Sequence, residues 1–200
     1  MKLLCVRHPQ PAIAPGHCYG ASDVPVAEDE LARVHAALAG AGLPGALPVY
    51  ASPLQRCSLL AQRLQPRALR LDARLAEMDF GAWELRPWSG IARVEVDAWA
   101  ADLLHYRPGG AESVLDVAAR VAAFVGDLRT SSYSGAPSGT GGDGPCGAPA
   151  GQAQALLICH AGTIRLLAAL ATGLPLEQAA LQAAATPHRI GYGEIVVLEC

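Results

Sequence analysis

The chain has 200 residues, a length that suits a single domain able to bury a large core. Its formal net charge of −3 gives no electrostatic case for a nucleic-acid partner or for binding to an anionic membrane. Hydrophobic residues make up 52% of the chain, but prolines, glycines and charges interrupt them too often for a membrane span, so a globular protein is expected.

The first predicted element is a buried strand over residues 3–6, which runs directly into Arg7 and His8. Because ligands of open α/β sheets lie beyond the carboxyl ends of the strands, both side chains are expected at a site. His8 is a candidate nucleophile for a phosphoryl group, and Arg7 is a candidate ligand for the oxygens of that group. Two solvated polar residues at a strand end are the alternative. Residues 9–26 are rich in proline and glycine and are expected to form a loop beside the site.

The next predicted elements are a helix over 28–41 and a second strand over 47–51. Ser52 follows that strand, and because serine is a good helix N-cap we predict a helix from there to about residue 64. Arg56 then lies in the first turn of this helix, at the carboxyl end of a strand, as the histidine of the first strand does. A solvated surface arginine is the alternative.

After a short edge strand over 68–71, the segment 75–84 mixes carboxylates, aromatic residues and glycine without a clear period. It is predicted to be a packed loop or a set of single turns. Glu77 in this segment is a candidate general acid for a leaving oxygen. On chemistry alone, Asp79 and Glu84 compete with it for that role.

Apolar content predicts a helix from residue 88 to about residue 104, with Trp99 buried. An amphipathic helix then opens at 112–113. Residues 131–152 consist mostly of glycine, serine and proline, a composition that cannot bury enough apolar surface to order itself. We therefore predict a disordered insertion there, within a single domain of residues 1–200.

The last part of the chain repeats the strand-to-helix pattern. A strand over 155–159 runs into His160, and a helix follows to about residue 171. A further helix over 176–184 and an antiparallel edge strand over 193–198 complete the predicted elements. A second histidine therefore joins a strand end to a helix N-terminus.

The three strand ends together carry two histidines and two arginines, a set that favours phosphoryl transfer. Arginine matches the geometry of phosphate oxygens, and the N-termini of the predicted helices favour an anion. A neutral imidazole can attack phosphorus, so His8 fits as nucleophile and no metal is required. A zinc site formed by His8 and His160 is the less favoured alternative. Adjacent arginines would repel the metal ion, and neither histidine has a carboxylate or cysteine at ligand spacing. A hydrolase with a serine nucleophile is also disfavoured, because Ser52 lacks the flanking glycines that the strand–serine–helix turn of such enzymes needs.

Motifs in four places, in order along the chain, resemble those of the histidine phosphatase superfamily, also called phosphoglycerate mutase-like: Arg7-His8, Ser52-Pro-Leu-Gln-Arg56-Cys, the segment from Leu75 to Glu84, and His160-Ala-Gly-Thr-Ile-Arg165. The resemblance implies an α/β fold of three layers, α/β/α, around a central, mostly parallel sheet. It implies a phosphohistidine on His8, with Glu77 as the proton donor. It also implies a phosphate pocket without a metal ion or other cofactor, formed by Arg7, Arg56, His160 and Gly162.

Residues 11–23 and the segment from Phe80 to Glu84 are similar to the branch that contains α-ribazole phosphatase of cobalamin synthesis. The Glu112-Ser113 pair resembles a Gly-Glu-Ser segment of the family near the substrate, here with Ala111 inserted. These resemblances imply α-ribazole 5′-phosphate as substrate and Tyr19, Ser22 and Glu112 as substrate-binding residues. Pro9 stands where the family has glycine, so any phosphate contact from that N–H is lost, and Gln10-Pro11 replaces the family's Glu-Thr. Both departures alter the loop over the phosphate and argue against mutase activity. The alternatives are a phosphoglycerate mutase-like phosphotransferase and a non-catalytic, phosphate-binding regulatory module.

The expected partner is a small-molecule phosphomonoester, bound by a monomer or a homodimer. The six cysteines include no Cys-x-x-Cys pair, and the apolar run before Arg7 is too short for a secretory signal. These features favour reduced thiols and a cytoplasmic location, with Cys5, Cys57 and Cys159 as small core residues.

Overall fold

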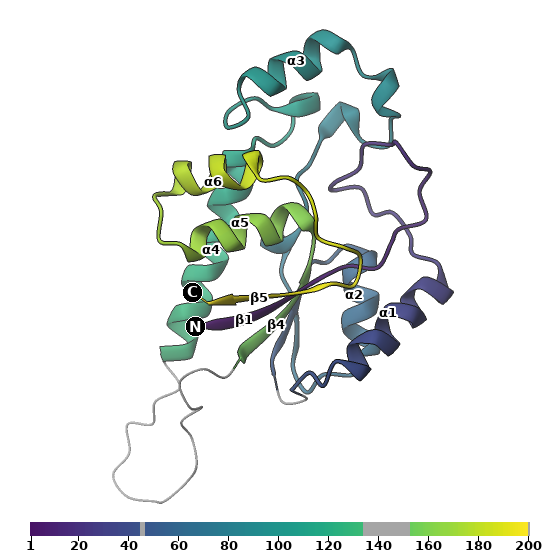
Figure 1. The fold of residues 1–200 in the computed structure, drawn as a ribbon, viewed down its shortest axis with the longest axis vertical. Helices are drawn as coiled ribbons and strands as arrows, with labels where there is room; N and C mark the ends of the chain where they lie inside the picture. The colour runs from purple at the N-terminus through teal and green to yellow at the C-terminus, as the bar shows by residue number, and fades with distance from the viewer. Residues whose placement is uncertain (45–46, 134–152, 200) are drawn as a thin grey trace, which may run out of the picture.

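The computed structural model describes residues 1–44, 47–133 and 153–199, which fold around one sheet (Figure 1). Its five strands lie in the order β3-β2-β4-β1-β5. Three of the neighbouring pairs are parallel, and β5 runs antiparallel to β1 at the edge, as predicted. The strands are β1 (Lys2–Arg7), β2 (Val49–Ala51), β3 (Leu69–Leu71), β4 (Ala153–Cys159) and β5 (Ile195–Glu199).

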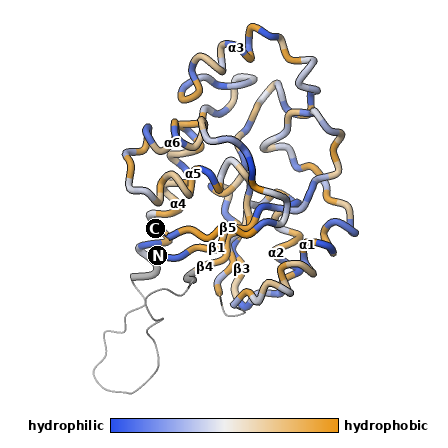
Figure 2. The backbone as a smooth tube through the Cα atoms, viewed as in Figure 1, coloured by the Kyte–Doolittle hydropathy of each residue, from blue (hydrophilic) through white to orange (hydrophobic). Residues whose placement is uncertain are grey.

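Helices cover both faces of this sheet. Alternate residues of β1 point to opposite faces, so Leu3 packs in one hydrophobic core and Leu4 in the other. The core on the Leu3 side includes residues of α4, α5 and α6, and the core on the Leu4 side includes residues of α1 and α2. Figure 2 shows the strands between them as largely hydrophobic. The three-layer α/β/α prediction is therefore confirmed. The helices are α1 (Glu28–Gly40), α2 (Gln55–Arg63), α3 (Arg93–Ala101), α4 (Val114–Tyr133), α5 (Ala161–Ala171) and α6 (Leu176–Ala185).

The segment before α4 forms a smaller body with its own hydrophobic cluster. As predicted, the 75–84 segment consists of single turns, with 3₁₀ turns at 73–75 and 81–83. The predicted helix over 88–104 is wrong in extent, since a 3₁₀ turn at 88–90 precedes the shorter α3. Ile91 interrupts it because its backbone is extended and its side chain is 6% exposed. Trp99, expected to be buried, is half-buried.

Two helix boundaries differ from the prediction. Helix α2 begins at Gln55 after an extended Leu54, so Ser52 is not its N-cap. Helix α4 continues to residue 133 and so takes up the first residues of the predicted insertion; residues 134–152 lie outside the described part of the chain. Its start is capped reciprocally, because Ser113 and Asp116 each accept a hydrogen bond from the amide of the other.

The three cysteines assigned to the core are buried with no exposed surface, which confirms that prediction: Cys5, Cys57 and Cys159. Within residues 1–44, 47–133 and 153–199, no helix combines the length and the apolar character that crossing a membrane requires.

Candidate active site

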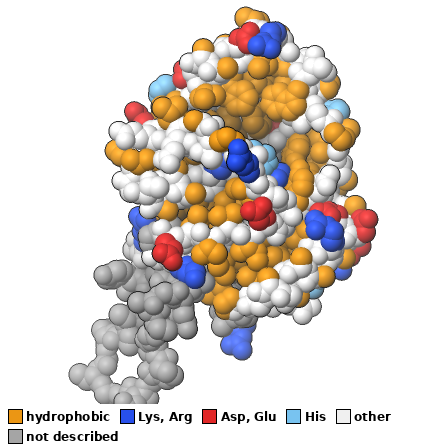
Figure 3. Space-filling view, viewed as in Figure 1, with side chains coloured by type: hydrophobic (Ala, Val, Ile, Leu, Met, Phe, Trp, Pro, Cys, Tyr) orange, Lys and Arg blue, Asp and Glu red, His pale blue; other side chains and the backbone are white. Residues whose placement is uncertain are grey.

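A cleft of about 410 Å³ lies at the carboxyl ends of the central strands. Figure 3 shows the hollow below α3, with hydrophobic side chains above it and basic and histidine side chains beneath them. The catalytic and phosphate-binding residues predicted from the sequence all line this cleft: Arg7, His8, Arg56, Glu77, His160 and Gly162. Strand ends that are far apart in sequence are thus brought together by the parallel pairing of β1, β4 and β2.

His8 is the first residue beyond β1 and is 3% exposed. Its Nδ1 lies 2.7 Å from the carbonyl oxygen of Pro9. Since a carbonyl only accepts, Nδ1 carries the proton and Nε2 carries the lone pair. Burial, followed by the positive charge of Arg56, lowers the pKa of His8 to about 3. The imidazole is therefore neutral at physiological pH and has a free nucleophilic nitrogen. Pro9 lacks an N–H, but its carbonyl fixes the tautomer.

Arg7 is held at one end of its guanidinium. Nη1 donates a 2.5 Å hydrogen bond to the carbonyl of Ile190, and the guanidinium carbon lies 3.7 Å from the ring centroid of Tyr192. Its Nε is buried and has no hydrogen-bond partner among the described residues. The side chain is thus oriented by the protein and retains a donor that suits a phosphate oxygen.

Arg56, in the first turn of α2, is fully buried. Nη1 donates to the carbonyl of Ser22 over 2.7 Å, and Nη2 donates to the carbonyl of Gly20. Its Nε donates to Nδ1 of His160 over 3.3 Å. The loop after β1 therefore fixes this cation beside the second histidine.

His160, the N-cap residue of α5, lies against His8, with 4.9 Å between the two ring centroids. Because Nδ1 accepts from Arg56, the proton sits on Nε2 and is donated to Oγ of Ser52 over 2.9 Å. Burial, and then the charges of His8 and Arg56, lower the pKa of His160 well below its ordinary value. Both histidines are therefore neutral in the folded protein. Ser52, predicted as an N-cap, instead orients this ring.

Glu77 is the only one of the three candidate acids that lines the cleft. Its Oε2 accepts a 3.0 Å hydrogen bond from the amide of Gly162, and its Oε1 accepts from the amide of Met78. Asp79 is instead bonded to the amide of Gly81. Glu84 accepts four backbone hydrogen bonds, which hold its pKa below the usual range despite burial. The geometry therefore separates three carboxyl groups that chemistry alone left equal.

The sequence of this chain matches one known protein family over two thirds of its length. The model of the histidine phosphatase superfamily (branch 1) matches residues 3–136. The chain belongs to this superfamily. A search of curated proteins returned no match.

Solved structures of phosphatases share its fold. Mycobacterial glucosyl-3-phosphoglycerate phosphatase, solved with VO3, is 26% identical over 99% of this chain and 90% of its own, with a TM-score of 0.77. Alpha-ribazole phosphatase from Shigella flexneri is 22% identical over 100% of this chain and 90% of its own, with a TM-score of 0.75. The family match, together with the 26% identical mycobacterial phosphatase, identifies the chain as a phosphatase.

In this histidine phosphatase, two of the three predicted substrate-binding residues lie outside the cleft lining. Tyr19 lines it, and its hydroxyl lies 3.0 Å from that of Tyr192. Ser22 instead supports Arg56 through its carbonyl. Glu112 is paired with Arg120 at 2.9 Å. Both residues are bonded to the protein's own chain, Ser22 through its backbone carbonyl and Glu112 through its carboxylate, so their substrate-binding roles stay predictions.

Sequence reasoning places an outer wall of the site within residues 79–113 but assigns no single residue to it, and it misses the wall from the loop before β5. Phe80, Trp88 and Trp99 line the cleft on the α3 side, and the two tryptophan rings are stacked with an interplanar angle of 4°. His188 lines it from the loop between α6 and β5, from which Tyr192 also contacts Arg7. The three tryptophans fall between residues 83 and 99 in a chain with 5% aromatic residues, which was an available signal. The loop between α6 and β5 carries no comparable signal in the sequence.

Within the described part of the chain, no group of three or more histidine, cysteine, aspartate or glutamate side chains is arranged to hold a metal ion. The cleft instead offers basic and neutral donors, and the positive charges of Arg56 and Arg7 both contribute to the lowered pKa of His8. Such a lining suits an anion.

Proposed function

We propose that this phosphatase hydrolyses a small phosphomonoester through a phosphohistidine on His8. The observation that carries the proposal is the 2.7 Å contact between Nδ1 of His8 and the carbonyl of Pro9. It leaves the Nε2 lone pair available, and burial keeps the ring unprotonated. A buried histidine with this tautomer has no need of a separate base to become a nucleophile.

In the first half of the reaction, Nε2 of His8 attacks the phosphorus and the ester P–O bond breaks. Arg7 and Arg56 neutralise charge on the phosphoryl oxygens as it builds. Glu77, protonated at that point, transfers its proton to the leaving oxygen, so the product alcohol departs neutral. The charge on His8 is offset by the phosphoryl group that it now carries.

In the second half, the Glu77 carboxylate takes a proton from water while the water oxygen attacks phosphorus. The P–N bond breaks, and its electron pair returns to Nε2. Inorganic phosphate leaves, and both His8 and Glu77 return to their starting states. One carboxyl group thus serves as acid and then as base, which requires it to lie beside the phosphorus in both steps.

For the substrate, we propose an ester whose alcohol carries a planar, largely apolar group, with α-ribazole 5′-phosphate as the candidate. Support comes from the wall formed by Phe80, Trp88 and Trp99. The indole Nε1 of Trp99 is buried without a hydrogen-bond partner among the described residues, and it is a donor that suits a heteroaromatic nitrogen or a sugar hydroxyl. Glucosyl-3-phosphoglycerate, the substrate named for one relative, has no aromatic group to pack there.

The test is turnover of p-nitrophenyl phosphate and α-ribazole 5′-phosphate in the presence of EDTA. We expect turnover to survive the chelator and to vanish in His8→Ala. The matched control is His105→Ala, because His105 is exposed and lies outside this cleft. Rapid acid-free quenching and mass spectrometry should find one phosphoryl group on the peptide that contains His8. Loss of turnover on adding EDTA would contradict the mechanism, and the absence of turnover with any phosphomonoester would favour a binding module.

A further inference from the structure

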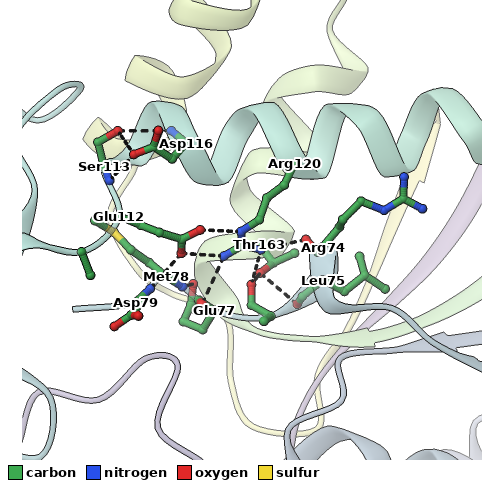
Figure 4. Close-up of polar contacts among 12 residues, drawn as sticks. Arg74, Leu75, Glu77, Met78, Asp79, Glu112, Ser113, Asp116, Arg120 and Thr163 are labelled. Carbon is green, nitrogen blue, oxygen red and sulfur yellow. Dashed lines mark hydrogen bonds and ion pairs between the residues drawn. The ribbon is translucent and has the colours of Figure 1, made fainter. Parts of the chain in front are cut away.

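The loop that carries Glu77 is held from outside the cleft by one side chain of α4. Arg120 reaches from α4 to the 74–77 segment (Figure 4). Its Nη1 donates to the carbonyls of Arg74 and Ala76, each over 2.8 Å. Its Nη2 donates to the carbonyl of Glu77 itself over 3.2 Å. Three backbone acceptors around the proton donor are therefore bound by a single guanidinium.

Glu112 completes the coordination of this guanidinium. Its Oε1 and Oε2 accept from Nε and Nη2 of Arg120 over 2.9 and 3.0 Å. All of the N–H donors of the arginine are thus used, since a guanidinium has five and Arg120 makes five hydrogen bonds. Glu112 also accepts from the amide of Asp79 over 2.9 Å, so it ties the far side of the same loop to the ion pair.

The opposite side of the loop is held by α5. Thr163 donates to the carbonyl of Ala76 over 3.2 Å, and the amide of Gly162 binds the carboxylate of Glu77. The backbone that bears Glu77 is therefore fixed between two helices, by Arg120 from α4 and by the first turn of α5. The side chains of Arg120 and Glu112 are 19% and 27% exposed, so water competes only partly for these bonds.

The charge of Arg120 also acts within the site, because it contributes to the lowered pKa of His160. Neither Arg120 nor Glu112 lines the cleft. They touch no group expected to react, yet they contact the backbone of the residue that transfers the proton.

We propose that Arg120, oriented by Glu112, is a positioning residue that holds Glu77 at the distance and angle needed for proton transfer. This inference rests on the proposed role of Glu77. A general acid acts only when its proton lies within hydrogen-bond reach of the leaving oxygen, and small displacements of a reacting group are costly. Without the guanidinium, the carbonyls at 74, 76 and 77 lose their shared partner and the loop can shift.

The experiment compares kcat/KM for p-nitrophenyl phosphate, whose leaving group needs no proton, with that for an alkyl phosphate, whose leaving group does. In Arg120→Met we expect the alkyl value to fall by about tenfold to a hundredfold and the aryl value to fall much less. Arg120→Lys keeps the charge but not the planar fork, and we expect the same selective loss. The matched control is Arg107→Met. Arg107 also binds a backbone carbonyl and an α4 carboxylate, those of Ala111 and Asp116, without contacting the 74–77 segment.

A double-mutant cycle separates positioning from general stabilisation. If Arg120 acts through Glu77, adding Arg120→Met to Glu77→Gln should cost no further alkyl activity. Additive losses in the double mutant, or equal losses on the aryl and alkyl substrates, would overturn the proposal. If Arg120→Met is poorly folded, Arg120→Lys and Glu112→Gln give the same comparison of the two substrates. An equal effect of Glu77→Gln alone on both substrates would instead overturn the role of Glu77 as the acid. Failure of this inference and failure of the proposed function are therefore distinguishable.

Discussion

The amide of Gly162, in the first turn of α5, donates a 3.0 Å hydrogen bond to the carboxylate of Glu77. A Cβ at position 162 would lie 2.3 Å from Oε1 of Glu77, closer than real side-chain contacts allow. The missing side chain is therefore what lets the carboxylate reach the N-terminus of the helix, whose partial positive charge favours it. Gly162, implied by resemblance as a phosphate-binding residue, has this contact as its direct role in the structure.

The first prediction concerns Gly162→Ala. The added methyl group meets the flexible end of Glu77, so the fold should persist while the carboxylate moves. We expect kcat/KM for an alkyl phosphate to fall by about a hundredfold, with a smaller loss for p-nitrophenyl phosphate. The control is Gly126→Ala in α4, where an added Cβ meets no atom within 4 Å. That change should leave activity intact and raise stability by up to about 1 kcal/mol. Unchanged alkyl turnover in Gly162→Ala would contradict the prediction.

The second prediction concerns Ser52→Ala. Its hydroxyl is the partner of Nε2 of His160, and both groups are fully buried. Removing it leaves a buried N–H without an acceptor, which costs about 1–3 kcal/mol of unfolding free energy. It also frees the ring that packs beside His8, so kcat/KM should fall on all substrates alike. Ser58→Ala is the control, since Ser58 is similarly buried in α2 but is not among the residues bonded to His160. Wild-type melting temperature in Ser52→Ala would count against the assigned tautomer.

The position of His8 can be predicted from local sequence, whereas the role of Ser52 cannot. The apolar run before Arg7 and His8 marks a strand and its carboxyl end, so their place in the sheet follows from local pattern. Ser52 looks locally like an N-cap. Its bond to His160 depends on β2 lying beside β4, a pairing between residues about a hundred positions apart. Tertiary pairing overrides the local preference there.

The same reasoning explains the other differences. Glu77, Asp79 and Glu84 are chemically alike, and what separates them is which amides the folded loops bring to each carboxylate. Glu112 was expected to bind substrate because of its motif. Its partner is instead Arg120, eight residues later in α4. The residue types alone do not indicate whether the carboxylate binds a ligand or an arginine of the protein.

The third prediction concerns stability against pH. His8 and His160 have pKa values below the ordinary 6.5 in the folded state, His8 about 3. As the pH falls below 6.5, the unfolded chain therefore takes up protons that the folded chain does not, and stability decreases. Each such proton contributes about 1.4 kcal/mol per pH unit. Urea unfolding between about pH 6.5 and pH 5.5 should show this slope, before the glutamates of the unfolded chain begin to take up protons. His8→Asn should reduce it, and an unchanged slope in that variant would contradict the assignment.

The last prediction concerns Glu84→Gln. Glu84 accepts hydrogen bonds from four backbone amides, those of Gly20, Ala21, Ser22 and Phe80. The amide of glutamine keeps one acceptor oxygen but sets N–H groups against the other donors, so we expect a loss of about 2 kcal/mol in unfolding free energy.

Activity should also fall in Glu84→Gln, because the carbonyls of this loop orient Arg56. We propose that Arg56 binds the phosphoryl group and not the leaving oxygen, so kcat/KM should drop by the same factor for aryl and alkyl phosphates. Glu28→Gln is the control, with a side chain 74% exposed on α1, and it should change stability by no more than about 0.5 kcal/mol. A loss confined to alkyl phosphates in Glu84→Gln would return Glu84 to the list of proton donors and weaken the case for Glu77.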